Sequence, residues 1–136
     1  MTQEMKKWFD MANTDLGVAK HLNKTYHPKP LEIICYHCQQ SAEKSIKALI
    51  IYCKLPGGLP KIHDLSFLLN QLKNQIKIAD IYYDYADALT PYGVAIRYPN
   101  ELFLTEKHAQ EAIKNAEAIL EWTSTIIQTN IVSSEK

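Results

Sequence analysis

Apolar side chains recur at spacings of three and four residues along most of the chain, which is the period of a helix with one buried face. The first such segment is Met5–Leu22, and the longest uninterrupted one is Leu31–Lys54. Residues 23–30, which separate them, contain two prolines and several turn-forming residues. Proline removes a backbone donor and biases the preceding residue away from helix. The pattern therefore predicts two long helices in the first half of the chain.

The same helical period returns in the second half of the chain. The run Pro56–Pro60 ends the second long helix, because it combines two prolines with two glycines. Residues 94–104 show no regular period and predict an irregular connection. Residues 131–136 are expected to form a frayed polar tail. The other predicted helices cover residues 65–76, 81–89 and 106–130, after the candidate capping residues Asp64, Asp80 and Thr105.

Five helical segments with short connections, and no convincing alternation of period two, predict an all-α fold. We expect an up-and-down antiparallel bundle of four to five helices in a single domain over residues 1–130. With 136 residues, of which 46% are apolar and 22% charged, the chain is long enough to bury about two thirds of its unfolded surface. Its core therefore needs neither disulfides nor a structural metal.

Charge and cysteine content narrow the classes of function. The chain has 15 basic and 15 acidic side chains, which argues against holding nucleic acid by bulk electrostatics, so any phosphate site must be local. No apolar run approaches the roughly 18 to 20 residues of a membrane span, and the first residues lack a signal-peptide core. An odd number of cysteines, three, fits a reducing compartment. These observations predict a cytoplasmic protein without a membrane partner.

One face of the predicted helix Leu31–Lys54 has an unusual composition. With about 100° between successive residues, its polar members fall within about 80° of one another, opposite the apolar arc. They are His37, Gln40, Lys44 and Lys47, and Ile33 and Ile51 fall in the same stripe. A stripe that mixes imidazole, amide, lysine and isoleucine is more typical of a contact surface than of a purely solvated one. The alternative is an ordinary solvated face, since exposed lysines opposite a core are common.

Arg97 is the only arginine, and it lies in the segment 94–100 between two predicted helices. A guanidinium group binds phosphate or carboxylate bidentately and keeps its charge at any relevant pH, and loop residues on a rigid scaffold often carry function. It could instead pair with an acidic side chain or cap the carbonyl groups of a helix end.

Two other groups of residues suggest chemistry but have simpler interpretations. Cys35 and Cys38 point into the apolar arc whereas His37 points away, so the three cannot converge on a metal, and both cysteines are expected to be small buried hydrophobes. His63 and Asp64 could form a catalytic pair, but a residue beside a capping Asp is commonplace and no nucleophile is indicated. We therefore predict no metal, no cofactor and no catalytic residue.

Four sequence elements in a fixed order resemble the HEPN domain of prokaryotes and higher eukaryotes, over roughly residues 4 to 127. They are Ala12-x-x-Asp15-Leu16-x-x-Ala19, the run Tyr36–Leu49, Pro60-x-x-His63-Asp64-Leu65, and Leu89-x-Pro91-Tyr92 leading to Arg97-Tyr98-Pro99. The resemblance implies a helical bundle that pairs into a homodimer, with a nucleotide- or RNA-binding cleft near the interface. Many members of the family are encoded beside a minimal nucleotidyltransferase, and some are the toxin of a toxin–antitoxin pair. The expected phosphate- or nucleotide-binding residues are His37, Gln40, Lys44, Lys47, Arg97 and Tyr98.

Ribonuclease members of that family carry an Arg followed, after four to six residues, by a His. Here those positions hold Leu102, Phe103 and Leu104, so the resemblance does not extend to ribonuclease activity. A degenerate ribonuclease that uses His37 or His63 with Arg97 stays open as an alternative. So does a pure protein-interaction module, and charge reversal at the two lysines of the stripe would separate it from a ligand-binding one.

Overall fold

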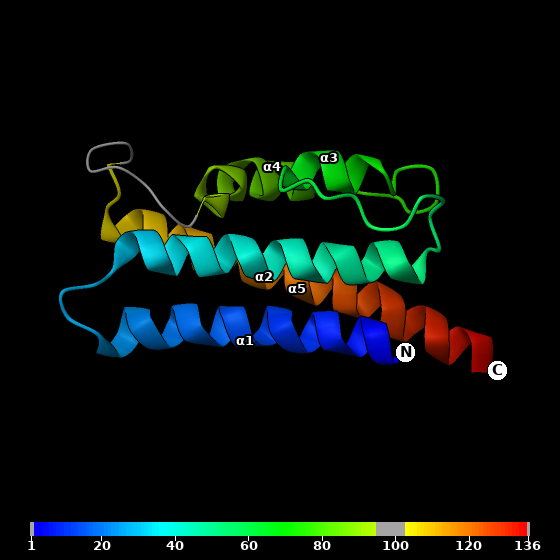
Figure 1. Cartoon of the computed structure of the whole chain (residues 1–136), viewed down its shortest axis with the longest axis horizontal. Helices are drawn as coiled ribbons and strands as arrows, with labels where there is room; N and C mark the ends of the chain where they lie inside the picture. Colours follow the sequence, from blue (N-terminus) through cyan, green and yellow to red (C-terminus); the bar gives the residue numbers. More distant parts are fainter. Residues whose placement is uncertain (1, 95–102, 136) are drawn as a thin grey trace.

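Five α-helices and one short 3-10 helix make up the described part of the computed structural model, residues 2–94 and 103–135 (Figure 1). In chain order they are α1 (Gln3–Thr25), α2 (Leu31–Tyr52), α3 (Leu65–Asn70), α4 (Asp80–Leu89), η1 (Thr90–Gly93) and α5 (Glu106–Glu135). These residues include no β-strand. The predicted all-α helical bundle is confirmed.

Helix α2 occupies the centre of the molecule. It lies between α1 on one side and the layer formed by α3 and α4 on the other, with α5 behind it (Figure 1). Its position follows from its sequence, because apolar or small side chains recur around most of its circumference. The face of α2 opposite α5 is not covered by another helix, and it faces outward between α1 and the α3–α4 layer.

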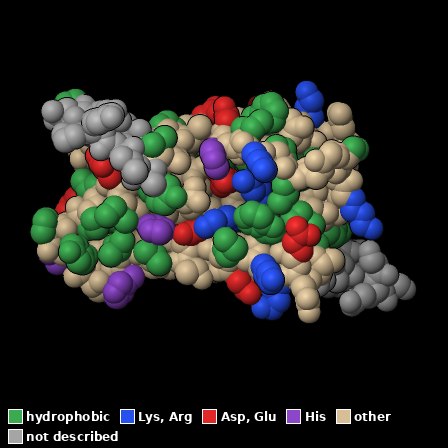
Figure 2. Space-filling model, in the orientation of Figure 1, with side chains coloured by type: hydrophobic (Ala, Val, Ile, Leu, Met, Phe, Trp, Pro, Cys, Tyr) green, Lys and Arg blue, Asp and Glu red, His purple; other side chains and the backbone are tan. Residues whose placement is uncertain are grey.

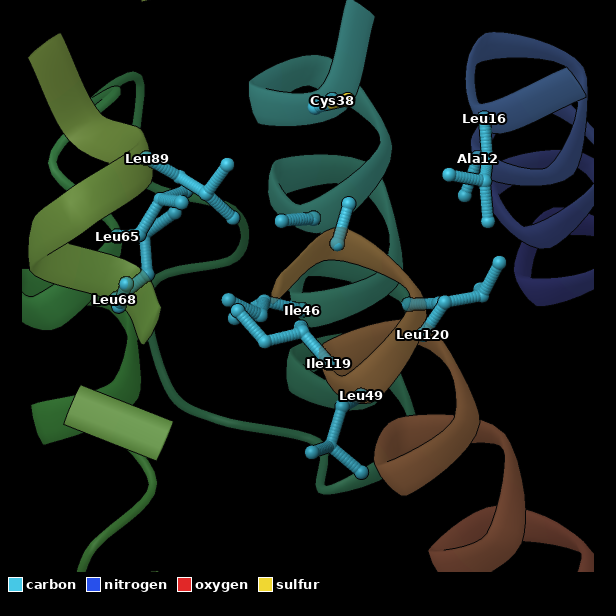
Figure 3. Packing of buried hydrophobic residues seen from close by; sticks show 14 of the residues in the cluster. Ala12, Leu16, Cys38, Ile46, Leu49, Leu65, Leu68, Leu89, Ile119 and Leu120 are labelled. Atoms are coloured by element: carbon cyan, nitrogen blue, oxygen red, sulfur yellow. The ribbon is translucent and has the colours of Figure 1, made fainter. Parts of the chain in front are cut away.

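The core is one continuous cluster of side chains centred on α2. Figure 3 shows Ile46 and Leu49 of α2 beside Ile119 of α5, with side chains of α3 and α4 on one side and of α1 on the other. The fully buried residues also include the alanines Ala12 of α1 and Ala42 of α2. Small buried side chains of this kind let neighbouring helix backbones approach closely.

Two of the predicted capping residues act as expected. Asp64 accepts a hydrogen bond from the backbone N–H of Phe67 at 3.1 Å and begins α3. The hydroxyl of Thr105 accepts from the backbone N–H of His108 at 3.4 Å at the start of α5. Asp80 is not a cap: it is the first residue of α4, where its carboxylate stabilises the helix dipole instead.

The ends of two helices differ from the predictions. Helix α3 stops at Asn70, because the following turns are closed by tighter bonds such as that from Leu72 N–H to the Leu69 carbonyl. Leu72 is nevertheless fully buried, so the apolar pattern of the sequence extends beyond the end of the helix. Helix α5 ends at Glu135, five residues beyond the predicted end at Asn130, and residues 131–135 contain no Gly or Pro that would stop it earlier.

Among the described residues, no helix is both long and apolar enough to cross a membrane.

Candidate functional site

The stripe predicted on α2 lies on the uncovered face of that helix. Figure 2 shows this side of the molecule, where histidine, acidic and lysine side chains lie next to one another across the middle and hydrophobic side chains gather toward one end. Ile33 is 51% exposed. The polar members of the stripe are less accessible, because α1 and the loop before α3 reach over its two edges. We call this surface the polar face of α2 and define it by His37, Gln40, Glu43, Lys44 and Lys47 of α2, Asp15 of α1 and His63 of the loop.

Asp15 joins α1 to the polar face. It is 8% exposed, and each of its carboxylate oxygens accepts one hydrogen bond from α2. Oδ1 accepts from Nδ1 of His37 at 2.9 Å, and Oδ2 accepts from Nζ of Lys44 at 2.5 Å. A carboxylate can only accept, so Nδ1 of His37 carries the proton and Nε2 is directed to other partners. The charge of Lys44 is therefore balanced by Asp15.

Glu43 occupies the other edge of the polar face and is almost completely buried. Its Oε1 accepts from Nε2 of Gln39 at 3.0 Å and from Nδ1 of His63 at 2.8 Å, and its Oε2 accepts from Nζ of Lys47 at 2.9 Å. Burial alone would raise the pKa of Glu43, but these hydrogen bonds outweigh it and hold the pKa below the ordinary value of 4.5. Glu43 is therefore ionised at neutral pH.

Lys47 is buried, contrary to its expected outward direction. Its side chain is 10% exposed, its ammonium group is paired with Glu43, and it also lies 5.8 Å from the ring centroid of Trp8 on α1. A cation over an indole face is a favourable electrostatic contact, and it strengthens where water is excluded. Lys47 therefore links α1 to α2 and presents little charge to solvent.

Among the histidine and lysine side chains of the polar face, the two imidazoles are the most exposed. Two lysines are matched by two carboxylates within the face, so its formal charge is zero when both histidines are neutral. The side chain of His37 is 27% exposed and that of His63 is 67% exposed. In each imidazole Nδ1 is held by a carboxylate, which fixes the ring and its tautomer as in other carboxylate–histidine pairs. The chemistry available to a ligand is therefore that of two oriented Nε2 atoms.

The binding residues expected from the sequence did not include Asp15, Gln39, Glu43 and His63, which belong to the hydrogen-bond network of this surface. Gln40 joins the network by donating from Nε2 to Oε1 of Gln39 at 2.7 Å. The spacing Gln39–Glu43–Lys47, at successive intervals of four residues, was the available signal for one half of this network. The other predicted site residues, Arg97 and Tyr98, lie outside the described residues.

His63 and Asp64 do not form a pair. Asp64 caps α3, whereas Nδ1 of His63 bonds to Glu43 of α2. The structural role predicted for Asp64 is confirmed, and His63 instead belongs to the polar face.

Cys35 and Cys38 are fully buried in the core, as predicted. Burial raises the pKa of Cys35 to about 11 and that of Cys38 higher still. The thiolate is the reactive form, so we expect both thiols to resist a thiol reagent such as Ellman's reagent at about pH 8 in the native protein. Cys53 is partly exposed and is expected to react first. Rapid release of more than one equivalent from the folded protein would contradict the burial of α2, and denaturant should expose all three thiols.

The fold is thus an all-α bundle whose central helix carries two carboxylate–imidazole pairs on its uncovered face. The family model described as HEPN domain matches residues 5–127. The chain belongs to the HEPN domain family, as the order of its motifs indicated.

Individual relatives agree with this assignment. A protein of Methanocaldococcus jannaschii named "Putative toxin MJ1304" is 32% identical over 132 residues, which cover 85% of this chain and 83% of that protein. The crystal structure of ST0689, described as an archaeal HEPN homologue, has a TM-score of 0.70 and 25% identity, and the match covers 93% of this chain and 99% of that one. The crystal structure of TT1696 from Thermus thermophilus has a TM-score of 0.76 and 23% identity, over 90% of this chain and 98% of that one. The latter likeness concerns the fold alone.

Proposed function

We propose that this HEPN chain binds a phosphate group of a nucleotide or of RNA at the polar face of α2. We further propose that it is a homodimeric cytoplasmic component of a toxin–antitoxin-like system and acts with a minimal nucleotidyltransferase partner. The name of the Methanocaldococcus relative and the family assignment support the toxin–antitoxin element of this proposal.

The observation that carries the binding proposal is the orientation of the two imidazoles. Within the described part of the chain, the hydrogen bonds of His37 and His63 use Nδ1, which leaves Nε2 of each ring for a ligand. Each Nε2 accepts a hydrogen bond when its ring is neutral and donates one when the ring is protonated. A phosphate oxygen accepts from such donors, and protonated imidazoles add the local positive charge that the whole chain lacks. Lys44 has further N–H groups beyond the one bound to Asp15 and lies on the same face.

Arginine is the residue type that binds phosphate most strongly, and Arg97 lies close in sequence to a residue that contacts the network of the polar face. Gly93 at the end of η1 adjoins Gln39, since a Cβ atom at Gly93 would lie 3.0 Å from the amide carbon of that side chain. Arg97 follows Gly93 by four residues in the sequence.

Calorimetric titration tests the binding proposal. We expect inorganic phosphate, ATP, GTP or a short RNA to bind the wild-type protein, and Arg97→Ala or His37→Gln to weaken binding about tenfold or more, which corresponds to roughly 1.4 kcal/mol for each lost charge-assisted contact. His21→Ala is the matched control, because His21 is exposed and bonds only to Thr25 of its own helix among the described residues. Equal binding by all variants would remove these residues from the site, and no binding of any ligand would refute the proposal.

A degenerate ribonuclease is the second candidate, and the carboxylate–imidazole pairs favour it. A carboxylate on Nδ1 fixes the ring and orients the opposite nitrogen, which is the geometry that general acid–base catalysis requires. His37 or His63 would then move the proton, with Arg97 stabilising charge on the scissile phosphate. Cleavage of an RNA panel by the wild-type protein, lost in His37→Gln or His63→Gln, would support this candidate. Intact RNA in the absence of any partner protein would count against it.

A further inference from the structure

His63 lies in a closed ring of hydrogen bonds. Its Nδ1 donates to Oε1 of Glu43 at 2.8 Å. The same Oε1 accepts from Nε2 of Gln39 at 3.0 Å, and Nε2 of Gln39 also donates to the backbone carbonyl of His63 at 3.2 Å. Gln39 therefore holds both the backbone of His63 and the carboxylate that binds its ring. The loop before α3 is fixed to α2 at this residue.

The amide of Gln39 has only one orientation that satisfies its neighbours. Gln39 is completely buried, and its Oε1 accepts from Nε2 of Gln40 at 2.7 Å while both N–H groups are used in the ring. Rotating the amide by 180° would place its oxygen against the carboxylate of Glu43 and the carbonyl of His63. Buried polar groups left without partners are costly, so the orientation is well determined.

Gly93 closes the other side of Gln39. A Cβ atom at position 93 would lie 3.0 Å from Cδ, 3.1 Å from Nε2 and 3.3 Å from Oε1 of Gln39. These separations are shorter than ordinary van der Waals contact, and a buried side chain with all its hydrogen bonds made has little room to move. Glycine at the end of η1 is therefore required by the amide beneath it.

We infer that His63 contacts the ligand through Nε2 and that Gln39 is the positioning residue that holds it there. The inference rests on the proposed phosphate-binding function. His63 is the most exposed polar group of the polar face, yet its Nδ1 partner is buried, so its ring has one anchored edge and one accessible edge. Gln39 contributes nothing to the ligand directly, because it is inaccessible to solvent.

Nitrogen-15 NMR of the imidazoles tests the positioning role in the full-length chain. A free neutral imidazole prefers the proton on Nε2, whereas the ring of His63 carries it on Nδ1. We expect the wild-type signals of His63 and His37 both to report Nδ1–H. In Gln39→Leu, which conserves approximate volume, the His63 signals should shift toward the free-imidazole pattern. The His37 signals should stay unchanged, since Asp15 holds that ring independently. Unchanged His63 signals in the variant would overturn the assignment of Gln39.

Inorganic phosphate, titrated at a lower pH at which the imidazoles are protonated and Nε2 can donate, tests the ligand contact. We expect both histidine signals to shift on titration of the wild-type protein. In Gln39→Leu the affinity should fall about three- to tenfold, the effect of one or two lost hydrogen bonds. Phosphate shifts at His37 but not at His63 would leave the proposed function standing and refute the inference. If phosphate shifts the signals of neither ring, the proposed function is refuted. The positioning role of Gln39 is then still tested separately by the tautomer of His63 in Gln39→Leu.

Gly93→Ala tests the ring from its other side and keeps the amide of Gln39. The added methyl group must displace that amide, so His63 should again lose its Nδ1–H signature and phosphate affinity, with His37 unaffected. If Gln39→Leu proves unstable, this variant gives the same readout. A wild-type spectrum and affinity in folded Gly93→Ala would show that the contact with Gln39 does not position His63.

Discussion

Replacing Ala42 by Glu is expected to unfold the domain. Ala42 is fully buried in the core of α2. A glutamate there would bury either a charge without a partner or a protonated carboxyl group without hydrogen-bond partners. Its side chain is also larger than the space that the alanine methyl group occupies in the core. The penalty is several kcal/mol, a large part of the roughly 5 to 15 kcal/mol that stabilises a typical domain.

Circular dichroism with urea denaturation measures this effect. Ile33→Glu is the matched control, because it adds the same charge to the same helix at a position that is 51% exposed. We expect the control to keep the helical spectrum and a midpoint close to that of the wild-type protein. An Ala42→Glu protein that melts like the control would show that this side of α2 does not face the core.

Replacing Glu43 by Gln is expected to destabilise the protein at neutral pH and to flatten its response to acid. The variant leaves Lys47 buried without its counter-ion, and breaking a buried pair costs about 3 kcal/mol or more. The pKa of Glu43 is lower in the folded protein than its ordinary value of 4.5. Its contribution to stability is therefore fully present above that value and is lost as the pH falls through the folded pKa.

Urea midpoints measured between about pH 7 and pH 3 test both statements. The difference between the wild-type protein and Glu43→Gln should be constant above about pH 5 and should shrink on further acidification. Glu111→Gln is the control, because the side chain of Glu111 is 58% exposed and lies 4.0 Å from Lys107. A constant difference at every pH would mean that Glu43 titrates as it does in the unfolded chain.

The fold was predictable because the period of apolar residues reports which side of each helix is buried. Periodicity predicted α1, α2 and the start of α5 to within a few residues. It overestimated α3, because a buried side chain such as Leu72 satisfies the pattern equally well from a turn. The turns after α3 keep side chains such as Leu72 buried, although the α-helix does not continue there.

The candidate site was predictable only in part. The helical period identified the face of α2 on which His37 and Lys44 lie. The helical period gives the direction in which each side chain of α2 points. It does not show which side chains of other helices or loops lie in that direction. The carboxylate of Asp15 comes from a different helix, and His63 comes from a loop. For the same reason Lys47, at the edge of the stripe, is covered by Trp8 and Glu43 where the pattern predicted solvent.

The central place of α2 affects how the molecule comes apart. Every other described helix contacts α2. Separating α2 from the bundle would therefore expose buried apolar side chains of all the other helices to water. We therefore expect the backbone amides of α2 to exchange through opening of the entire bundle, whereas the outer helices can fray singly. The polar face is thus built on the helix that we expect to exchange most slowly within the described part of the chain.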